Sequence, residues 1–177
     1  MGIDESQPSL TDILTERPSP LSISTQNTIQ IMVFKKPVSV LVVIHTAALD
    51  VLLLERTQHR GFWQSVTGSQ EDNEPLNLTA QREVFEETGI QAPITQFLDW
   101  QKTNRFEIFP EWQYRYGPGV THNTEHVFSL MLTEKCLIKI TPDEHVTYQW
   151  LPWKEAAAAC FSWSNRDAIL TLGESAR

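Results

Sequence analysis

Apolar and β-branched residues run without interruption through "PVSVLVVIH", residues 37–45, and predict a buried strand. "VLLLER", residues 51–56, follows the short turn "TAALD" and is predicted to pair back on the first strand as a hairpin. Later apolar stretches predict further strands at 94–100, 105–109, 125–132 and 147–151. The chain therefore contains enough strands to build one sheet.

Other segments have the composition and end signals of helices, and they cover residues 75–88, 153–160 and 164–173. Pro75 fits the first turn of a helix, where its missing N–H costs nothing, and Gly89 fits the C-terminal stop. In the last helix, Ser164 with Asp167 three residues on has the form of a capping box, and Gly173 fits its end. Helices interspersed with strands predict a mixed sheet of the α/β or α+β class.

The first 31 residues lack this patterning. They are rich in Ser, Thr, Pro and Gln, and we interpret residues 1–31 as a flexible N-terminal leader in which 10–16 could form one short helix. The domain is predicted to span residues 32–177. A chain of 177 residues is long enough for one domain with a substantial core.

The charge narrows the possible partners. With 22 acidic against 14 basic residues, the formal net charge is −8, which argues against nucleic-acid or anionic-membrane binding. No stretch approaches the roughly 20 apolar residues of a membrane span, and the acidic N-terminus lacks the features of a secretory signal. Cys136 and Cys160 form no C-x-x-C pair, and we interpret them as buried reduced thiols. We expect a cytoplasmic protein.

The most unusual local feature is a group of carboxylates in "REVFEETGI", residues 82–90. Glu83, Glu86 and Glu87 are spaced by three and four residues, so a helix places them on one face, where they repel each other. They also lie near the helix C-terminus, where the macrodipole disfavours acids. Arg82 is the only base in the 17 residues that end at Glu87, and the same stretch holds six acids.

This acidic face has two interpretations. It can be a solvated helix surface, which is the common case for runs of Glu. Alternatively, the carboxylates can hold Mg²⁺ or Mn²⁺, which prefer hard oxygen ligands and often share their coordination with substrate phosphates. Spacing alone leaves both interpretations open.

The longer segment "GSQEDNEPLNLTAQREVFEETGI" resembles the complete Nudix box, from Gly68 through Glu74 to the acidic cluster, Gly89 and Ile90. The resemblance implies an α/β/α sandwich with a mixed sheet in which the box forms a loop–helix–loop. It also implies a metal-dependent pyrophosphohydrolase that acts on diphosphates. The implied metal-facing carboxylates are Glu83, Glu86 and Glu87. Arg82 would orient them, and the four residues together form the implied catalytic set. The implied cofactor is Mg²⁺, with Mn²⁺ as an alternative.

The flanking stretches "FWQSVTGS", "FEIF", "RYGPGVTHNTEHVFSLML" and "FSWSNRDAI" resemble the bacterial Nudix enzymes that cleave dihydroneopterin triphosphate in folate biosynthesis. That resemblance covers roughly residues 33–172. Glu144 matches a further metal-ligand position outside the box. The implied substrate residues are Lys35, Arg56, Thr67, Phe106, Glu107, Ile108, Phe109 and Ser162. Glu107 is the most suggestive, since a carboxylate can accept hydrogen bonds from the amino-pyrimidinone edge of a pterin.

Each of these residues also has a plain structural interpretation. Phe106 and Phe109 have the spacing of core aromatics, and Arg56 and Glu144 would by default be solvated surface charges. His122, His126 and His145 lack metal-ligand spacing, and we interpret them as structural.

Two rival functions stay open. The first is a broad nucleoside triphosphate pyrophosphatase, because guanine shares the hydrogen-bonding edge of a pterin. The second is a non-enzymatic Nudix-fold sensor, although such proteins typically lose box carboxylates and this chain keeps them. The expected partner is a small-molecule triphosphate, without nucleic acid or membrane, and a monomer is favoured.

Overall fold

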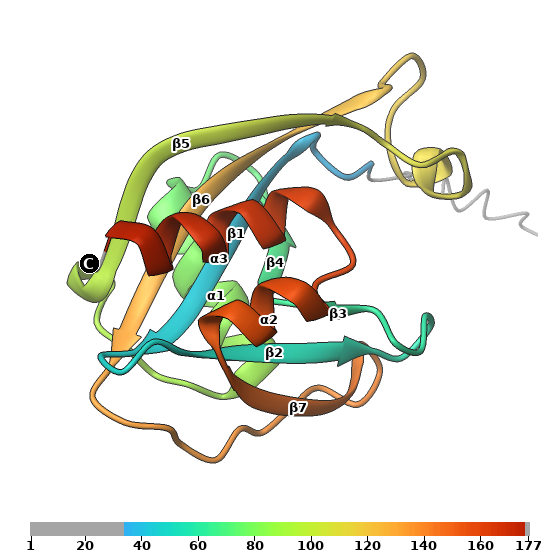
Figure 1. Ribbon diagram of the computed structural model, residues 1–177. Coiled ribbons are helices and arrows are strands. Elements are labelled where there is room, and N and C mark those ends of the chain that lie inside the picture. The colour runs from blue at the N-terminus through green and yellow to red at the C-terminus, as the bar shows by residue number, and fades with distance from the viewer. Residues whose placement is uncertain (1–33, 176–177) are drawn as a thin grey trace, which may run out of the picture. The chain divides into compact units, whose positions relative to one another are not determined.

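The computed structural model describes residues 34–175, and every structural statement below concerns these residues (Figure 1). The predicted leader 1–31, with its predicted short helix, lies outside them. Within the described residues, no helix is long and apolar enough to cross a membrane.

One mixed sheet of seven strands forms the centre of the domain. The strands are β1 (Val38–Thr46), β2 (Asp50–Arg56), β3 (Trp63–Gln64), β4 (Val66–Ser69), β5 (Phe97–Glu107), β6 (His122–Leu132) and β7 (His145–Pro152). Their order is β3-β2-β1-β6-β5, with β4 paired to β1 and β7 paired to β2. β1 runs parallel to β6 from Val38↔Thr124 to Thr46↔Leu132, and its other partners are antiparallel.

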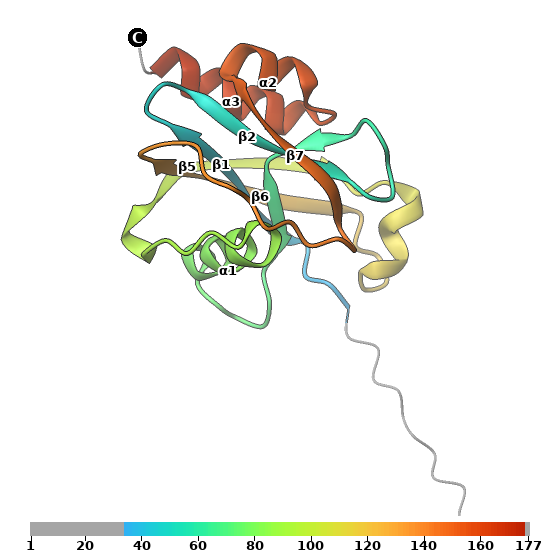
Figure 2. The same ribbon diagram turned by 90° about the horizontal axis from the view of Figure 1, so that it is seen from below.

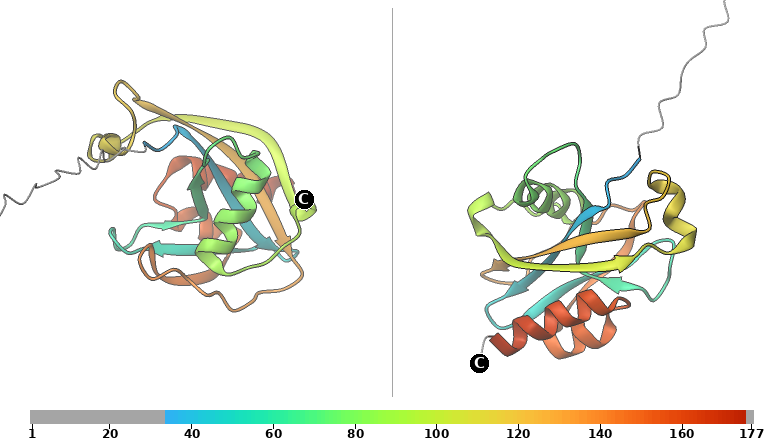
Figure 3. Two further views of the ribbon diagram at one scale, coloured as in Figure 1. Left: turned by 180° about the vertical axis from the view of Figure 1, so that it is seen from behind. Right: turned by 90° about the horizontal axis from the view of Figure 1, so that it is seen from above.

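Helices cover both faces of the sheet, as the view from below shows (Figure 2). α1 (Leu76–Thr88) packs on one face, while α2 (Trp153–Ala159) and α3 (Trp163–Ser175) pack on the other (Figure 3). Alternation along β1 divides its side chains between two cores, with Val40, Val42 and Ile44 toward α1 and Leu41 and Val43 toward α2 and α3. The predicted α/β/α sandwich is confirmed. Two short 3-10 helices, η1 (Ile94–Gln96) and η2 (Pro110–Arg115), lie in the connections.

Helix α1 begins and ends where the sequence predicts. Pro75 is its N-cap residue, and Gly89 follows its last turn in the left-handed conformation, at φ 71°. The Gly89 N–H donates to the carbonyl of Phe85 at 2.8 Å, which closes the last turn. These ends fix the position of the acidic turn between them.

The strands predicted at 94–100 and 105–109 are wrong as two separate elements. Residues 94–96 form η1, and a single strand, β5, then runs from 97 to 107 with a register shift between Asp99 and Thr103. The reason is tertiary. β6 supplies pairing partners on both sides of the irregularity, so the polar residues between the two apolar stretches stay in the sheet.

The predicted ends of the last helix are also wrong. α3 begins at Trp163, and the hydroxyl of Ser162 accepts the N–H of Asn165 at 3.3 Å, so Ser162 takes the capping position predicted for Ser164. Ser164 is instead buried in the first turn. Gly173 lies inside α3, and a β-carbon there would come within 2.2 Å of the Trp153 ring, so this position requires a glycine. Close packing of α2 on α3 therefore explains this glycine.

Both cysteines are free thiols, but their predicted burial is wrong for Cys136, which is exposed. This residue lies in the connection between β6 and β7, and the apolar cores are built without it. Cys160 is partly covered and packs beside the α2–α3 core, where burial raises the pKa of its thiol to about 12.

Candidate active site

The acidic turn of α1 distributes its carboxylates over three environments. Glu87 is 3% exposed and faces the sheet, Glu83 is partly buried, and Glu86 is exposed. The helical spacing explains these differences in burial. Residues three and four apart lie on the same side of a helix, but they are covered to different extents by the sheet. The predicted common face therefore exists, with one carboxylate at its bottom and one at its solvent edge.

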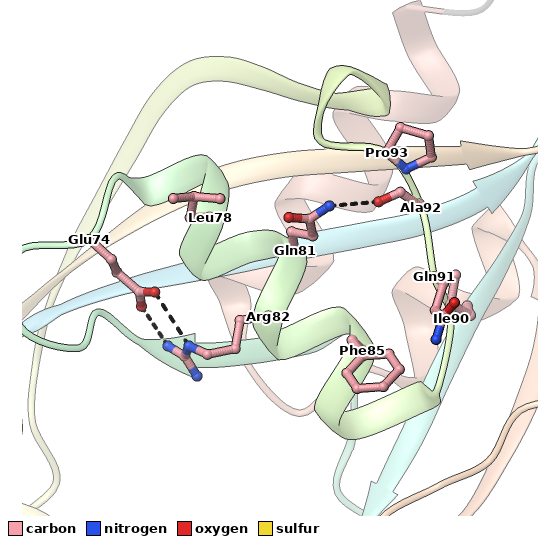
Figure 4. A pocket seen from close by; sticks show the side chains of 9 residues that line it. All are labelled: Glu74, Leu78, Gln81, Arg82, Phe85, Ile90, Gln91, Ala92 and Pro93. Carbon is pink, nitrogen blue, oxygen red and sulfur yellow. Dashed lines mark hydrogen bonds and ion pairs between the residues drawn. The ribbon is translucent and has the colours of Figure 1, made fainter.

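Arg82 forms ion pairs with the acids around it. Its guanidinium lies 2.9 Å from Glu83, 3.0 Å from Glu86 and 2.7 Å from Glu74. It also donates to the backbone carbonyl of Ser69 at the end of β4, at 3.0 Å. The bond from Arg82 lowers the pKa of Glu74. Figure 4 shows the pair of Glu74 and Arg82 among the residues that line a hollow beside α1.

The carboxylate of Glu83 lies directly against the backbone of β4. A β-carbon added to Gly68 would come within 1.7 Å of the Glu83 carboxyl carbon, so only glycine permits this contact. Burial raises the pKa of Glu83 to about 7, although the positive charge of Arg82 acts in the opposite direction. β4 therefore fixes one acid of the helix beside the sheet.

The third acid, Glu87, meets two residues from the start of β7. Its Oε2 lies 3.2 Å from Nε2 of His145, and both side chains are buried. One ligand atom each from Glu87, Glu144 and His145 lies within 4.8 Å of the others. Burial raises the pKa of Glu87, opposed by its bond to His145. Sequence reasoning missed His145, because the contact joins residues 58 positions apart and no local spacing signals it.

These three side chains fit a divalent metal ion. The two carboxylates are oxygen donors that Mg²⁺ and Mn²⁺ prefer, and the imidazole is a donor that suits Zn²⁺ better than Mg²⁺. Nδ1 of His145 is buried without a partner, and Oε2 of Glu87 and Nε2 of His145 have only each other, at 3.2 Å, so a cation beside them would satisfy polar atoms that the described residues leave open.

A cavity of about 550 Å³ opens next to this cluster. Every predicted substrate residue lines it, and so do Glu87 and Glu144. Glu83, Glu86 and Arg82 also belong to α1 but do not line the cavity. The carboxylate of Glu83 lies against Gly68, which does line it. The lining residues come from the segment before β1, all seven strands, α1, η2, the start of α3 and the loops between them, so the fold brings together positions that are far apart in sequence.

The walls combine cations with aromatic rings. Lys35, Arg56 and Arg115 supply positive charge, and the guanidinium of Arg56 lies 5.8 Å from the ring centre of Trp112. Arg56 also donates to Gln64 at 3.2 Å. The aromatic lining consists of Phe106, Phe109, Trp112, Tyr116, Phe161 and Trp163. Sequence reasoning missed Trp112, Arg115 and Tyr116, because only the path of η2 brings them to the cavity.

The cavity also has a polar floor on β6. Glu125 is 6% exposed, and Nδ2 of Asn104 on β5 donates to its Oε1 at 3.1 Å. Asn123, two residues earlier on the same strand, is 4% exposed and donates to Ser39 at 2.7 Å. Burial raises the pKa of Glu125, opposed by bonds from Asn104 and Ser164. Neither Asn123 nor Glu125 was predicted, although they alternate in "HNTEHV" as residues of one strand face do.

The arrangement suits a ligand that is anionic at one end and aromatic at the other. Cations and a metal-binding cluster stabilise negative oxygens, and aromatic walls favour a planar ring. A cavity of this size, largely apolar with a few convergent polar groups, is typical of a small-molecule site.

Comparison with known proteins identifies relatives. Residues 35–172 match the NUDIX domain family. The chain is 48% identical over 140 residues to the dihydroneopterin triphosphate diphosphatase of Escherichia coli K12, which covers 77% of this chain and 92% of that protein. It is 40% identical over 141 residues to the enzyme of the same name from Haemophilus influenzae, covering 78% of this chain and 88% of that protein.

A solved structure agrees with these relatives. The structure of the E. coli dihydroneopterin triphosphate pyrophosphohydrolase superposes with a TM-score of 0.72 at 47% identity, covering 78% of this chain and 96% of that chain. The similarity in sequence and in fold therefore covers more than three quarters of the chain.

Proposed function

The chain belongs to the NUDIX family, and we propose that it hydrolyses dihydroneopterin triphosphate to dihydroneopterin monophosphate and pyrophosphate, a step of folate biosynthesis. One observation carries the proposal. The cavity joins a cluster that can hold a metal ion, positively charged side chains and an aromatic wall in one space, which are the groups that a triphosphate attached to a planar ring requires.

We assign the metal-holding role to Glu83, Glu86, Glu87 and Glu144, and His145 joins Glu87 and Glu144 in the cluster that the fold builds. The ion is Mg²⁺, with Mn²⁺ as the alternative. When bound, it neutralises phosphate charge and lowers the pKa of a coordinated water.

The protein's own side chains complete the reaction. Lys35 and Arg56 bind phosphate oxygens from the cavity wall, where a guanidinium forks two oxygens and an ammonium acts as a point charge. A carboxylate of the acidic cluster accepts the proton of the attacking water. Thr67 and Ser162 add hydroxyl donors, and Arg82 holds Glu83 and Glu86 in position.

The ring lies in the aromatic part of the cavity. Phe106, Ile108 and Phe109 form one wall, with Glu107 exposed beside them. Stacking on aromatic side chains binds planar rings, and its strength depends little on the substituents of the ring. For that reason guanine nucleotides are the second substrate class, and the broad nucleoside triphosphate pyrophosphatase is the alternative function.

A substrate panel tests the proposal. The full chain with Mg²⁺ is assayed on dihydroneopterin triphosphate, dGTP and dATP, and the released pyrophosphate is quantified. We expect kcat/KM to be highest for the pterin, by at least about tenfold over dGTP, because differential binding of related rings sets this ratio. Equal values for all three would establish the broad pyrophosphatase, and no turnover on any of them would favour a sensor.

A further inference from the structure

Two carboxylates border the part of the cavity that receives the ring, and they differ in environment. Glu107 is exposed at the end of β5, whereas Glu125 is 6% exposed on the floor formed by β6. An exposed carboxylate keeps its hydration, so exchanging water for a ring N–H changes little. A buried carboxylate has no such substitute, so each hydrogen bond made or lost there has a large effect.

The surroundings of Glu125 leave its charge uncompensated. Across residues 34–175, no Lys, Arg or His lies within ion-pair distance of it. Asn104 donates one hydrogen bond, and Ser164 at the start of α3 stabilises the charged form as well. A carboxylate offers about four acceptor positions, so it retains capacity for further donors.

An unsatisfied acceptor lies beside Glu125 on the same strand face. Asn123 points to the same side of β6 as Glu125, because the two residues are separated by one position. Its Nδ2 donates to Ser39, while its Oδ1 is buried without a hydrogen-bond partner. The floor of the cavity thus presents the remaining acceptor capacity of Glu125 beside the unpartnered Oδ1 of Asn123.

We propose that Glu125, assisted by Asn123, reads the amino-pyrimidinone edge of the substrate's ring and thereby selects the ring. This edge carries two adjacent N–H donors, from the ring nitrogen and the exocyclic amine, which match the two oxygens of a carboxylate. The inference rests on the proposed function for the substrate, and it extends to any ring with this edge, guanine included. Adenine presents one donor beside one acceptor, so it leaves part of the floor unpaired.

The strand order supports this placement. Two strands, β1 and β2, lie between β6 and β7 in the pairing path, so Glu125 lies away from Glu144 and His145 at the start of β7. The ring edge and the phosphates likewise lie at opposite ends of a pterin triphosphate. Glu125 therefore acts on ring selection and leaves the metal cluster untouched.

The variant Glu125→Gln tests the inference, because it keeps size but replaces one acceptor by a donor. The measured quantity is the ratio of kcat/KM for dGTP to that for dATP, and in parallel for dihydroneopterin triphosphate to dATP. We expect both ratios to fall by at least about 100-fold, since a site built to pair with N–H groups loses its discrimination when the pairing is removed. The glutamine also matches the donor–acceptor edge of adenine, so turnover of dATP is retained or raised.

Three comparisons separate ring selection from a structural role. Mn²⁺ affinity and thermal stability should match the unmodified protein. Glu155→Gln, on the exposed side of α2, is the matched control and should leave both ratios unchanged. Glu107→Gln should change the ratios less than Glu125→Gln. If Glu125→Gln does not fold, Asn123→Ala, which removes the unpartnered Oδ1, carries the test, with an expected fall of about tenfold.

The outcomes also separate this inference from the proposed function. Ratios within threefold of the unmodified protein in a folded Glu125→Gln variant would overturn ring selection, even if the pterin is the best substrate. An unmodified protein that ignores the pterin but prefers dGTP to dATP, and loses this preference in the variant, would support ring selection and reject the proposed substrate. An equal loss of kcat on all substrates would overturn the inference and place Glu125 in the scaffold.

Discussion

The contact between Gly68 and Glu83 allows a sharp test of the acidic site with a single methyl group. In Gly68→Ala, the new β-carbon would lie 1.7 Å from the carboxyl carbon of Glu83, whereas ordinary contact begins at 3.4 Å. The Glu83 carboxylate must therefore move by about 1.7 Å. Since a misplacement of roughly 1 Å in a catalytic constellation costs about 100-fold, we expect kcat to fall at least 100-fold, or about 2.7 kcal/mol in activation free energy.

The same substitution should have little effect on stability. The obstructing atoms belong to the far end of a flexible side chain, which can rotate away. Alanine in a strand gains about 0.5–1 kcal/mol over glycine through chain entropy, and the partly exposed pair of Arg82 with Glu83 contributes less than about 1 kcal/mol. The two terms offset each other, so the unfolding free energy should change by less than about 1 kcal/mol.

Two other glycines provide the controls. In Gly173→Ala the β-carbon would lie 2.2 Å from the Trp153 ring, which packs against the α2–α3 core and cannot rotate away easily, so we expect a loss of about 1–3 kcal/mol with unchanged kcat. In Gly117→Ala the β-carbon meets only Phe34 within 4 Å, at 3.9 Å, so neither quantity should change.

The assay combines pyrophosphate release with urea unfolding for all three variants. The expected pattern is loss of activity alone in Gly68→Ala and loss of stability alone in Gly173→Ala. A folded Gly68→Ala protein with kcat within threefold of the unmodified enzyme would refute the reasoning, because Glu83 would then either not lie against β4 or not take part in catalysis.

Three further predictions concern the metal site and the leader. Exhaustive chelation should abolish turnover, and Mg²⁺ at 100 times its Kd should add about 2.7 kcal/mol of stability by mass action, raising Tm in a thermal scan; full activity without metal would contradict the site. Glu87→Gln should lower kcat by about 10²–10³-fold, as removal of a preorganised charge does. Glu74→Gln should lower kcat less, because Arg82 keeps Glu83 and Glu86 as partners. Equal losses of kcat in the two variants would reject this ranking. Deleting residues 1–31 should leave kcat and Tm nearly unchanged, since every proposed site residue lies within 35–162; a truncated protein that unfolds would show that the leader is part of the domain.

Features that depend on neighbours in sequence were predicted correctly. The apolar stretch of β1 and the ends of α1 follow from side-chain patterning and from a glycine that tolerates positive φ. The acidic turn was found because helical spacing alone places Glu83, Glu86 and Glu87 together. Local geometry decides each of these features, so the residues themselves are sufficient evidence.

The predicted ends of the last helix were wrong because packing between elements overrides local sequence signals. Gly173 has the sequence appearance of a helix stop, yet it lies within α3, where the Trp153 ring occupies the space that a β-carbon would need. Ser164 has the appearance of a cap, yet it is buried, and Ser162 caps the helix instead. Nothing in the neighbouring sequence reports which surface will cover a residue.

The sequence by itself determined a mixed sheet with interspersed helices and the acidic helix. Through its resemblance to a family it also gave the α/β/α sandwich and part of the cavity lining. The tertiary structure alone decided that His145 meets Glu87, that Gly68 holds Glu83 against the sheet, and that Glu125 lies on the cavity floor. The physical reason is strand order. Pairing in the sheet and packing on it bring residues together across dozens of positions, and no periodicity along the chain encodes which strands become neighbours.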